Sequence, residues 1–137
     1  MKKLVYLIVL SIVLLASCSK DSDDNRDFTE NFVGVNVAAR DTCYGHNNGV
    51  FLYSVDIIKE DETTLLTNNL FGYGPFNVVK MDVINANEIS INYTDIAGRI
   101  FTGTGIKTGN ELMIDVVIDF PTQGFVNDNC DTVITYE

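Results

Sequence analysis

Alternation of apolar and polar residues from Phe32 onward is the feature that most constrains the fold of this chain. In residues 88–93, Ile89, Ile91 and Tyr93 point to one face and the polar residues to the other. Gly, Asn and Asp separate the apolar segments, and no stretch has a helical period over a helix length. The pattern predicts strands near residues 32–42, 50–59, 64–70, 77–84, 88–94, 99–107, 111–120 and 130–136.

Short connections link several of these strands, at residues 60–62, 85–87 and 108–110. Connections of this length make neighbouring strands antiparallel. An antiparallel sheet of eight strands must hide its two edges, and closing into a barrel removes them. The sequence therefore predicts an all-β fold, an eight-stranded antiparallel up-and-down barrel. A β-sandwich of two sheets is the alternative.

Two cysteines lie at the ends of this predicted sheet. Cys43 ends the first strand and Cys130 begins the last, so closure of the barrel would bring them together as a disulfide. Two free buried thiols are the alternative. A metal site is disfavoured because His46 is the only histidine and has no companion ligand at zinc spacing.

The N-terminal segment has the parts of a secretory signal. A basic start at residues 2–3 precedes an apolar run over 4–16, which is shorter than the roughly 20 residues that span a bilayer core. A transmembrane anchor is therefore the weaker alternative. The step Leu15-Ala16-Ser17-Cys18 resembles the lipobox of bacterial lipoproteins. The resemblance implies a signal peptide over 1–17 and a lipidated Cys18 that anchors the protein to a membrane.

Residues 19–27 are polar and charged, which predicts a flexible tether over 18–31 and a β-barrel domain over 32–137. Lys20 followed by acidic residues resembles the export signal of lipoproteins in Bacteroidota-type bacteria. That signal sends lipoproteins to the outer face of the outer membrane. The resemblance implies an outer-membrane location with exposure at the cell surface.

The charge of the chain restricts its partners. Residues 18–137 number 120, which suits one domain, and their formal charge is −12. Such a surface repels phosphate backbones, so no nucleic-acid partner is expected. A basic protein, a cation or a neutral ligand fits better.

Several motifs together resemble one family. They are the lipobox, the strand end at 41–43, the run at 103–114 and the closing strand at 130–136. They are similar to those of the small lipocalin-like surface lipoproteins of Bacteroidota, over most of the mature chain. The resemblance implies a lipocalin-like barrel and carries no catalytic signature. The chain has no Trp and so lacks the Gly-x-Trp signature of true lipocalins.

Catalysis has little support in the sequence. A lone His46 in a turn lacks the nucleophile and orienting group of a catalytic set, so we predict neither an enzyme nor a cofactor. Residues 127–129 with Asp131 offer oxygen atoms to calcium, but their spacing is not that of an EF-hand and turn formation is the favoured interpretation. Residues 131–133 resemble the three-residue O-glycosylation site of the same bacteria.

Two functions fit these observations. The first is a non-enzymatic binding module that takes a small apolar or glycan-like ligand at the barrel mouth. The second is an interaction or inhibitor protein that engages another macromolecule through its loop rim. A solidly packed interior would favour the second function over the first.

Connections in an up-and-down meander alternate between the two ends, which places those at 44–49, 71–76, 94–98 and 121–129 together, opposite the tether. These connections hold most of the loop aromatics, and recognition residues commonly lie on loops of a rigid scaffold. The alternative is that the rings merely plug the mouth. We predict a ligand-binding edge formed by Tyr44, Tyr73, Phe76 and Phe125, with His46 beside them.

The lipobox is tested by removing its cysteine. Cys18→Ala is expected to accumulate as unprocessed precursor and to incorporate no labelled palmitate, because no other cysteine follows a signal-like run. Metabolic labelling and gel mobility measure both effects. Cys43→Ala is the matched control and should label normally; labelling of Cys18→Ala would contradict the lipobox.

Overall fold

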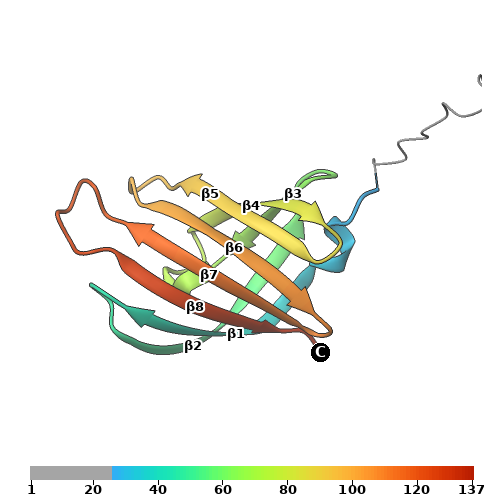
Figure 1. The fold of residues 1–137 in the computed structure, drawn as a ribbon, viewed down its shortest axis with the longest axis horizontal. Coiled ribbons are helices and arrows are strands. Elements are labelled where there is room, and N and C mark those ends of the chain that lie inside the picture. The colour runs from blue at the N-terminus through green and yellow to red at the C-terminus, as the bar shows by residue number, and fades with distance from the viewer. Residues whose placement is uncertain (1–25) are drawn as a thin grey trace, which may run out of the picture.

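Eight antiparallel strands, paired in sequence order, form one closed barrel in the computed structural model, which describes residues 26–137 (Figure 1). The predicted signal peptide over 1–17 and the lipidated Cys18 lie outside these residues. In the described part of the chain, no helix is long and apolar enough to cross a membrane. The strands are β1 (Gly34–Tyr44), β2 (Gly49–Lys59), β3 (Thr64–Asn68), β4 (Val78–Asn85), β5 (Glu88–Thr94), β6 (Ile100–Thr108), β7 (Glu111–Asp119) and β8 (Asp128–Thr135).

The barrel prediction is confirmed, and the sandwich alternative is wrong because β1 pairs with β8 as well as with β2. The strand ends differ from the predicted ones by a few residues. β3 ends at Asn68 because Asn69 takes a left-handed φ of 64°. β1 begins at Gly34 because Phe32 turns inward and packs in the core.

Side chains from all eight strands fill the interior of the barrel. Two glycines of β6 permit close packing: a Cβ on Gly105 would lie 2.7 Å from Ile89, and one on Gly103 would lie 2.2 Å from the backbone oxygen of Asp115. Such sites mark close approaches between neighbouring elements. The largest buried side chains are Phe32, Phe101, Ile57, Leu65, Leu70, Met81, Ile89, Ile91, Leu112, Ile114, Ile118 and Ile134.

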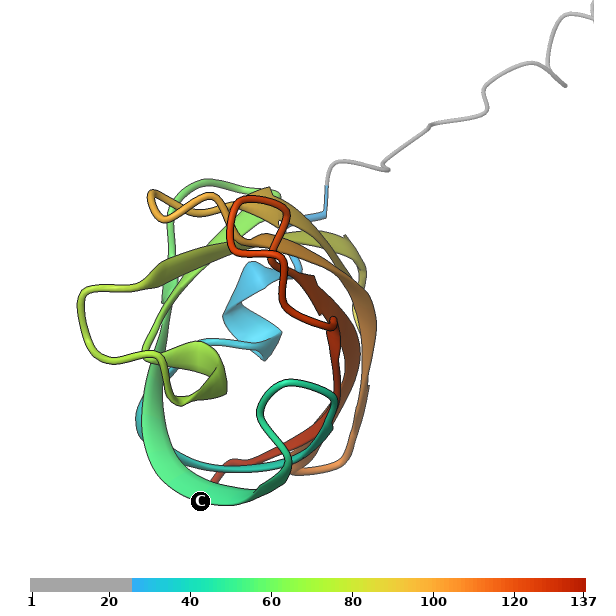
Figure 2. The ribbon, with the colours of Figure 1, turned by 90° about the vertical axis from the view of Figure 1, so that its left-hand side faces the viewer.

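A short 3-10 helix covers each end of the barrel, and sequence periodicity indicated neither (Figure 2). η1 (Thr29–Asn31) lies within the predicted tether, yet Thr29 is buried. The Tyr136 hydroxyl donates to the backbone oxygen of Phe32 at 2.8 Å and holds this turn. η2 (Leu70–Gly72) covers the opposite end with buried Leu70.

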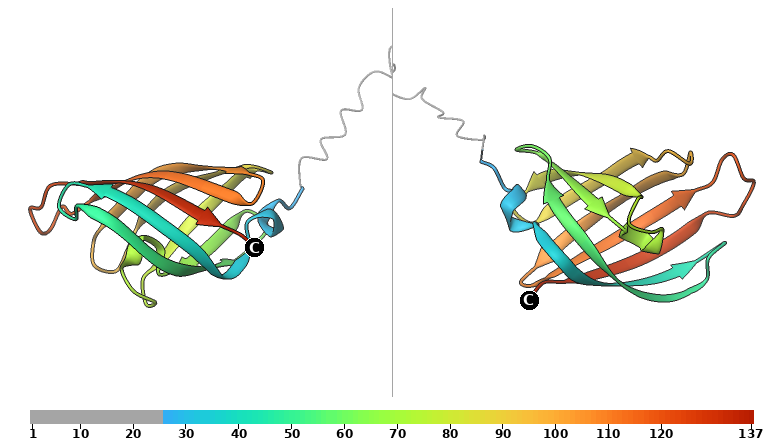
Figure 3. Two further views of the ribbon diagram at one scale, coloured as in Figure 1. Left: turned by 90° about the horizontal axis from the view of Figure 1, so that it is seen from below. Right: turned by 180° about the vertical axis from the view of Figure 1, so that it is seen from behind.

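The N-terminal turn and the C-terminus share one end of the barrel, while the longer connections gather at the other (Figures 1 and 3). We call these ends the tether end and the loop end. The four connections of the loop end follow β1, β3, β5 and β7.

The predicted disulfide between Cys43 and Cys130 is present. The two residues face each other in the β1–β8 register, at the loop end of the barrel. Both are buried, so the bridge closes the barrel from inside.

Removing this bridge tests how much closure contributes to stability. Its cysteines are 87 residues apart, for which the chain-entropy model gives about 4–5 kcal/mol. We expect Cys43→Ala with Cys130→Ala to lower the free energy of unfolding by about 2–5 kcal/mol in urea titrations. A reductant should destabilise the wild-type protein equally and leave the double variant unchanged. A wild-type protein insensitive to reductant would contradict the assignment.

Candidate functional site

Two buried carboxylates order the connections at the loop end. The first is Asp128, which begins β8 and points inward. Asn47 donates to it twice, from its backbone N to Oδ1 and from Nδ2 to Oδ2, both at 2.7 Å. The β1–β2 loop also passes so close to the β7–β8 loop that a Cβ on Gly45 would lie 2.0 Å from the backbone oxygen of Asn127. Only glycine fits there, and the two loops form one unit.

Asp95 is the second buried carboxylate and organises the β5–β6 turn. It accepts from the backbone N of Ala97 and of Arg99, each at 2.9 Å, and from Arg99 Nε at 2.6 Å. Arg99 Nη2 also donates to Asn77 Oδ1 at 2.7 Å, and its guanidinium lies 3.9 Å from the ring centroid of Tyr73. One arginine therefore ties the β5–β6 turn to the β3–β4 loop.

His46 belongs to an aromatic cluster. Its ring stacks on Phe125 with centroids 3.9 Å apart, and both rings meet Phe120 edge-on. Phe120 is buried, whereas His46 and Phe125 are exposed. The cluster joins the β1–β2 loop to the β7–β8 loop beside the Asp128 contact.

These contacts surround a hollow of about 460 Å³, which we call the outer hollow. All four connections of the loop end contribute to its wall. Its chemistry is mixed, with aromatic rings, side-chain amides and one arginine. The wall includes His46, Asn47, Tyr73, Asn77, Arg99 and Gln123.

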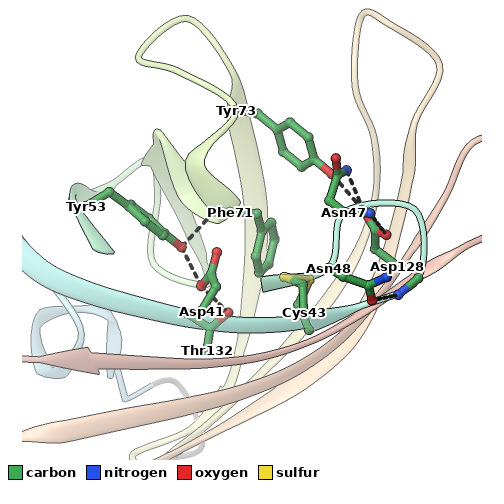
Figure 4. Close-up of a disulfide and its surroundings, with 11 residues drawn as sticks. Asp41, Cys43, Asn47, Asn48, Tyr53, Phe71, Tyr73, Asp128 and Thr132 are labelled. Carbon is green, nitrogen blue, oxygen red and sulfur yellow. Dashed lines mark hydrogen bonds between the residues drawn. A yellow bond between two sulfur atoms is a disulfide. The ribbon is translucent and has the colours of Figure 1, made fainter. Parts of the chain in front are cut away.

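A second hollow of about 230 Å³ lies deeper in the mouth, against the disulfide, and we call it the inner hollow. Figure 4 shows the disulfide and the side chains around it. Phe51, Phe71 and both cysteines supply most of the apolar wall of this hollow. Phe51 follows the inward alternation of β2, yet it is 40% exposed because it stands at the mouth.

Below the inner hollow lies a polar node formed by the buried Asp41 and Thr132 and the half-buried Tyr53 (Figure 4). Tyr53 Oη donates to Asp41 Oδ1 at 2.6 Å, and Thr132 Oγ1 donates to the same oxygen at 2.7 Å. Tyr53 Oη accepts from the backbone N of Phe71 at 2.9 Å. Phe71 has a φ of 60°, a costly conformation for a bulky residue. The node therefore holds η2 in a strained shape over the barrel.

Burial dominates the electrostatics of these groups. Burial raises the pKa of Asp41, and the hydrogen bonds from Tyr53 and Thr132 offset only part of this effect. Asp41 Oδ2 has no hydrogen-bond partner among the described residues. Burial, followed by the charge of Asp128, raises the pKa of Tyr73 to about 12. Tyr73 is therefore a neutral hydrogen-bond donor at physiological pH.

The structure places all five predicted edge residues at the loop end. Tyr73 and His46 line the outer hollow, and Phe125 stacks on His46. Tyr44 and Phe76 lie at the same end, 61% and 90% exposed, outside both linings. Their role in ligand binding stays a prediction.

Sequence reasoning missed Arg99 and the pairing of Asn47 with Asp128. Arg99 had a usable signal, because it is the only arginine or lysine in the four connections of the loop end. The pairing of Asn47 with Asp128 had none, since 81 residues separate the two.

Two motifs in the last strand are reinterpreted. Thr132, the acceptor in the O-glycosylation resemblance, is 1% exposed and bonded to Asp41, so the folded barrel does not present it. Alternation in β8 turns Asp128 inward and leaves Asp131 exposed, so residues 127–131 do not form one cluster of calcium ligands. Within residues 26–137, no group of three acidic, histidine or cysteine side chains is arranged to hold a metal.

Comparison with known proteins supports the fold. No protein-family model and no curated protein matches the chain. A redesigned β-barrel is similar in structure, with a TM-score of 0.56 and 8% identity over 81% of this chain and 96% of its own. A Bacteroides fragilis protein assigned to the outer membrane has a TM-score of 0.49 and 14% identity, over 81% of this chain and 53% of its own. The first likeness shows the barrel fold alone, and the family resemblance stays a prediction.

Replacing Asp41 by Asn tests the polar node. The pKa of Asp41 is higher in the folded than in the unfolded protein, so its contribution to stability is complete below about pH 4 and is lost as pH rises through the folded value. Asn carries no charge. We expect the free energy of unfolding of Asp41→Asn, relative to that of the wild type, to rise by about 1–3 kcal/mol between about pH 4 and pH 7.

Urea titrations at several pH values measure this shift. Asp82→Asn is the matched control, because Asp82 is an exposed aspartate on the outside of β4. Its difference from wild type should change much less over the same range. A difference for Asp41→Asn that is independent of pH would contradict the raised pKa.

Proposed function

We propose that this protein is a non-enzymatic binding module that takes a small apolar or glycan-like ligand at the loop end. The observation that carries the proposal is the outer hollow, to which all four connections of that end contribute. Its volume of about 460 Å³ is within the range of small-molecule sites. The interior of the barrel is filled with side chains, so binding would occur in the mouth.

The composition of the wall supports binding of a neutral ligand. Tyr73 offers an aromatic surface, and the exposed Gln123 carries an amide that both donates and accepts hydrogen bonds. The charge of Arg99 is matched by Asp95. A sugar presents both apolar C–H faces and hydroxyl groups, which such a wall can match.

The surroundings of His46 support binding over catalysis. Its ring packs on Phe125 and against Phe120, so its contacts are aromatic. A general base needs a nucleophile and an orienting group within hydrogen-bond reach. Packed in this way, the His46 ring supplies contact surface at the loop end.

Location is part of the proposal. We propose that Cys18 anchors the protein to the outer membrane, on the cell surface, with the loop end directed away from the lipid. The lipobox supports the anchor, and the resemblance of Lys20 and the following acidic residues to the export signal supports the surface location. The position of η1 at the opposite end of the barrel supports the orientation.

A second candidate is recognition of another macromolecule by the loop rim. Phe76 and Ile96 are 90% and 95% exposed on two connections of the loop end, where each offers apolar surface to a macromolecular partner. The packed interior also favours this candidate.

Blocking the outer hollow separates the two candidates. Ala97 is exposed and lines the outer hollow, so Ala97→Trp should obstruct it. We expect binding of neutral saccharides or small apolar alcohols, surveyed by ligand-observed NMR, to weaken by roughly tenfold or more, because about 1.4 kcal/mol of lost contact has that effect.

Ala38→Trp is the matched control, since Ala38 is exposed on β1 outside this site. It should bind like the wild type. If no saccharide or apolar probe binds the wild-type protein, the small-ligand function is wrong and the macromolecular candidate takes its place.

A further inference from the structure

The two hollows of the loop end adjoin, because Asn47 and Tyr73 line both of them. The inner hollow ends at the disulfide, while the outer hollow is built from the four connections. A ligand bound in the mouth would therefore contact two different environments, the inner hollow beside the disulfide and the outer hollow among the connections.

The inner hollow suits an apolar group. Phe51, Phe71 and the two bridged cysteines make up half of its lining residues. The only charged group there is Asp128, and both its oxygens already accept hydrogen bonds from Asn47. Its volume is about 230 Å³, and a cavity of about 150 Å³ accommodates benzene in another protein. The space therefore matches one ring or a short branched chain.

The outer hollow suits a neutral, hydroxyl-rich group. Arg99 lies in its wall, but Asp95 matches that charge and Asn77 accepts from the same guanidinium. The exposed Gln123 adds an amide that can both donate and accept. Asp95 already balances the charge of Arg99, so this arginine offers little attraction to an anion. A hydroxyl group, in contrast, can both donate and accept hydrogen bonds in this wall.

From this juxtaposition we infer that the ligand is amphipathic: an apolar ring or branched group enters the inner hollow, and a neutral polyhydroxylated head occupies the outer one. A sugar carrying an apolar aglycone has this form. The inference rests on the proposed function and specifies the ligand class of the same site.

Matched pairs of glycosides test the inference. Methyl and phenyl β-glycosides of glucose, galactose and N-acetylglucosamine share a head and differ only in the apolar group. Binding to the purified full chain is measured by calorimetry. We expect the phenyl member of at least one pair to bind about tenfold tighter or more, because it buries a ring that the methyl member lacks.

A variant that fills the inner hollow should remove this preference. Phe51→Trp places a larger side chain in the inner hollow and should remove the difference in affinity between the phenyl and methyl glycosides. Leu52→Trp is the matched control, because Leu52 is the next residue of β2 and is 78% exposed. Thermal melting of both variants verifies that each is folded.

Each alternative result is informative. Equal binding of methyl and phenyl glycosides overturns the amphipathic ligand and leaves the proposed function standing. A phenyl preference that survives in folded Phe51→Trp also overturns it, because the ring then binds elsewhere. If Phe51→Trp does not fold, Phe51→Leu replaces it; an unchanged preference when the hollow is widened likewise overturns the inference. Failure of every glycoside overturns it too, and the proposed function falls only if the small apolar alcohols also fail.

Discussion

Pairing of β1 with β8 is the contact on which the rest of the structure depends. It gives every strand two neighbours and leaves no unpaired edge. Its register sets Cys43 opposite Cys130 and Asp41 opposite Thr132. Because side chains alternate between faces, this register also turns Asp128 inward. The disulfide, the polar node and the carboxylate that orders the β1–β2 loop are thus consequences of one strand pairing.

Two features of the polar node beneath the inner hollow lower the stability of the fold. Asp41 Oδ2 is buried without a partner among the described residues, and such a group costs about 1–3 kcal/mol. Phe71 adds a left-handed backbone conformation, which costs a similar amount. Both occur in one node that holds η2 at the mouth. Strain that the surrounding structure maintains is commonly found at functional sites, and here it lies directly under the proposed ligand.

Local sequence patterns predicted the strands, but they could not predict side-chain contacts between residues far apart in the sequence. Alternation located the strands, and closure of the sheet predicted the Cys43–Cys130 bridge. Counting connections placed Tyr73 and His46 at the same end. η1 was missed because three residues in a polar segment have no period, and its order comes from burial of Thr29 and its contacts with the barrel. The hollow itself depends on side-chain pairs such as Arg99 with Asn77, which only the folded chain brings together.

The charge distribution explains why recognition at the loop end would rely on shape and hydrogen bonds. The chain carries a net charge of −10, yet the carboxylates that line or support the mouth already have partners within the protein. Asp95 forms an ion pair with Arg99, and Asp128 accepts hydrogen bonds from Asn47. The negative surface repels anions, and in the mouth Asp95 is paired with a cation, whereas Asp128 accepts hydrogen bonds from the neutral amide of Asn47. Steering by long-range fields therefore adds little for a neutral ligand. Its affinity would come from surface burial and hydrogen bonds formed only after it has entered the mouth.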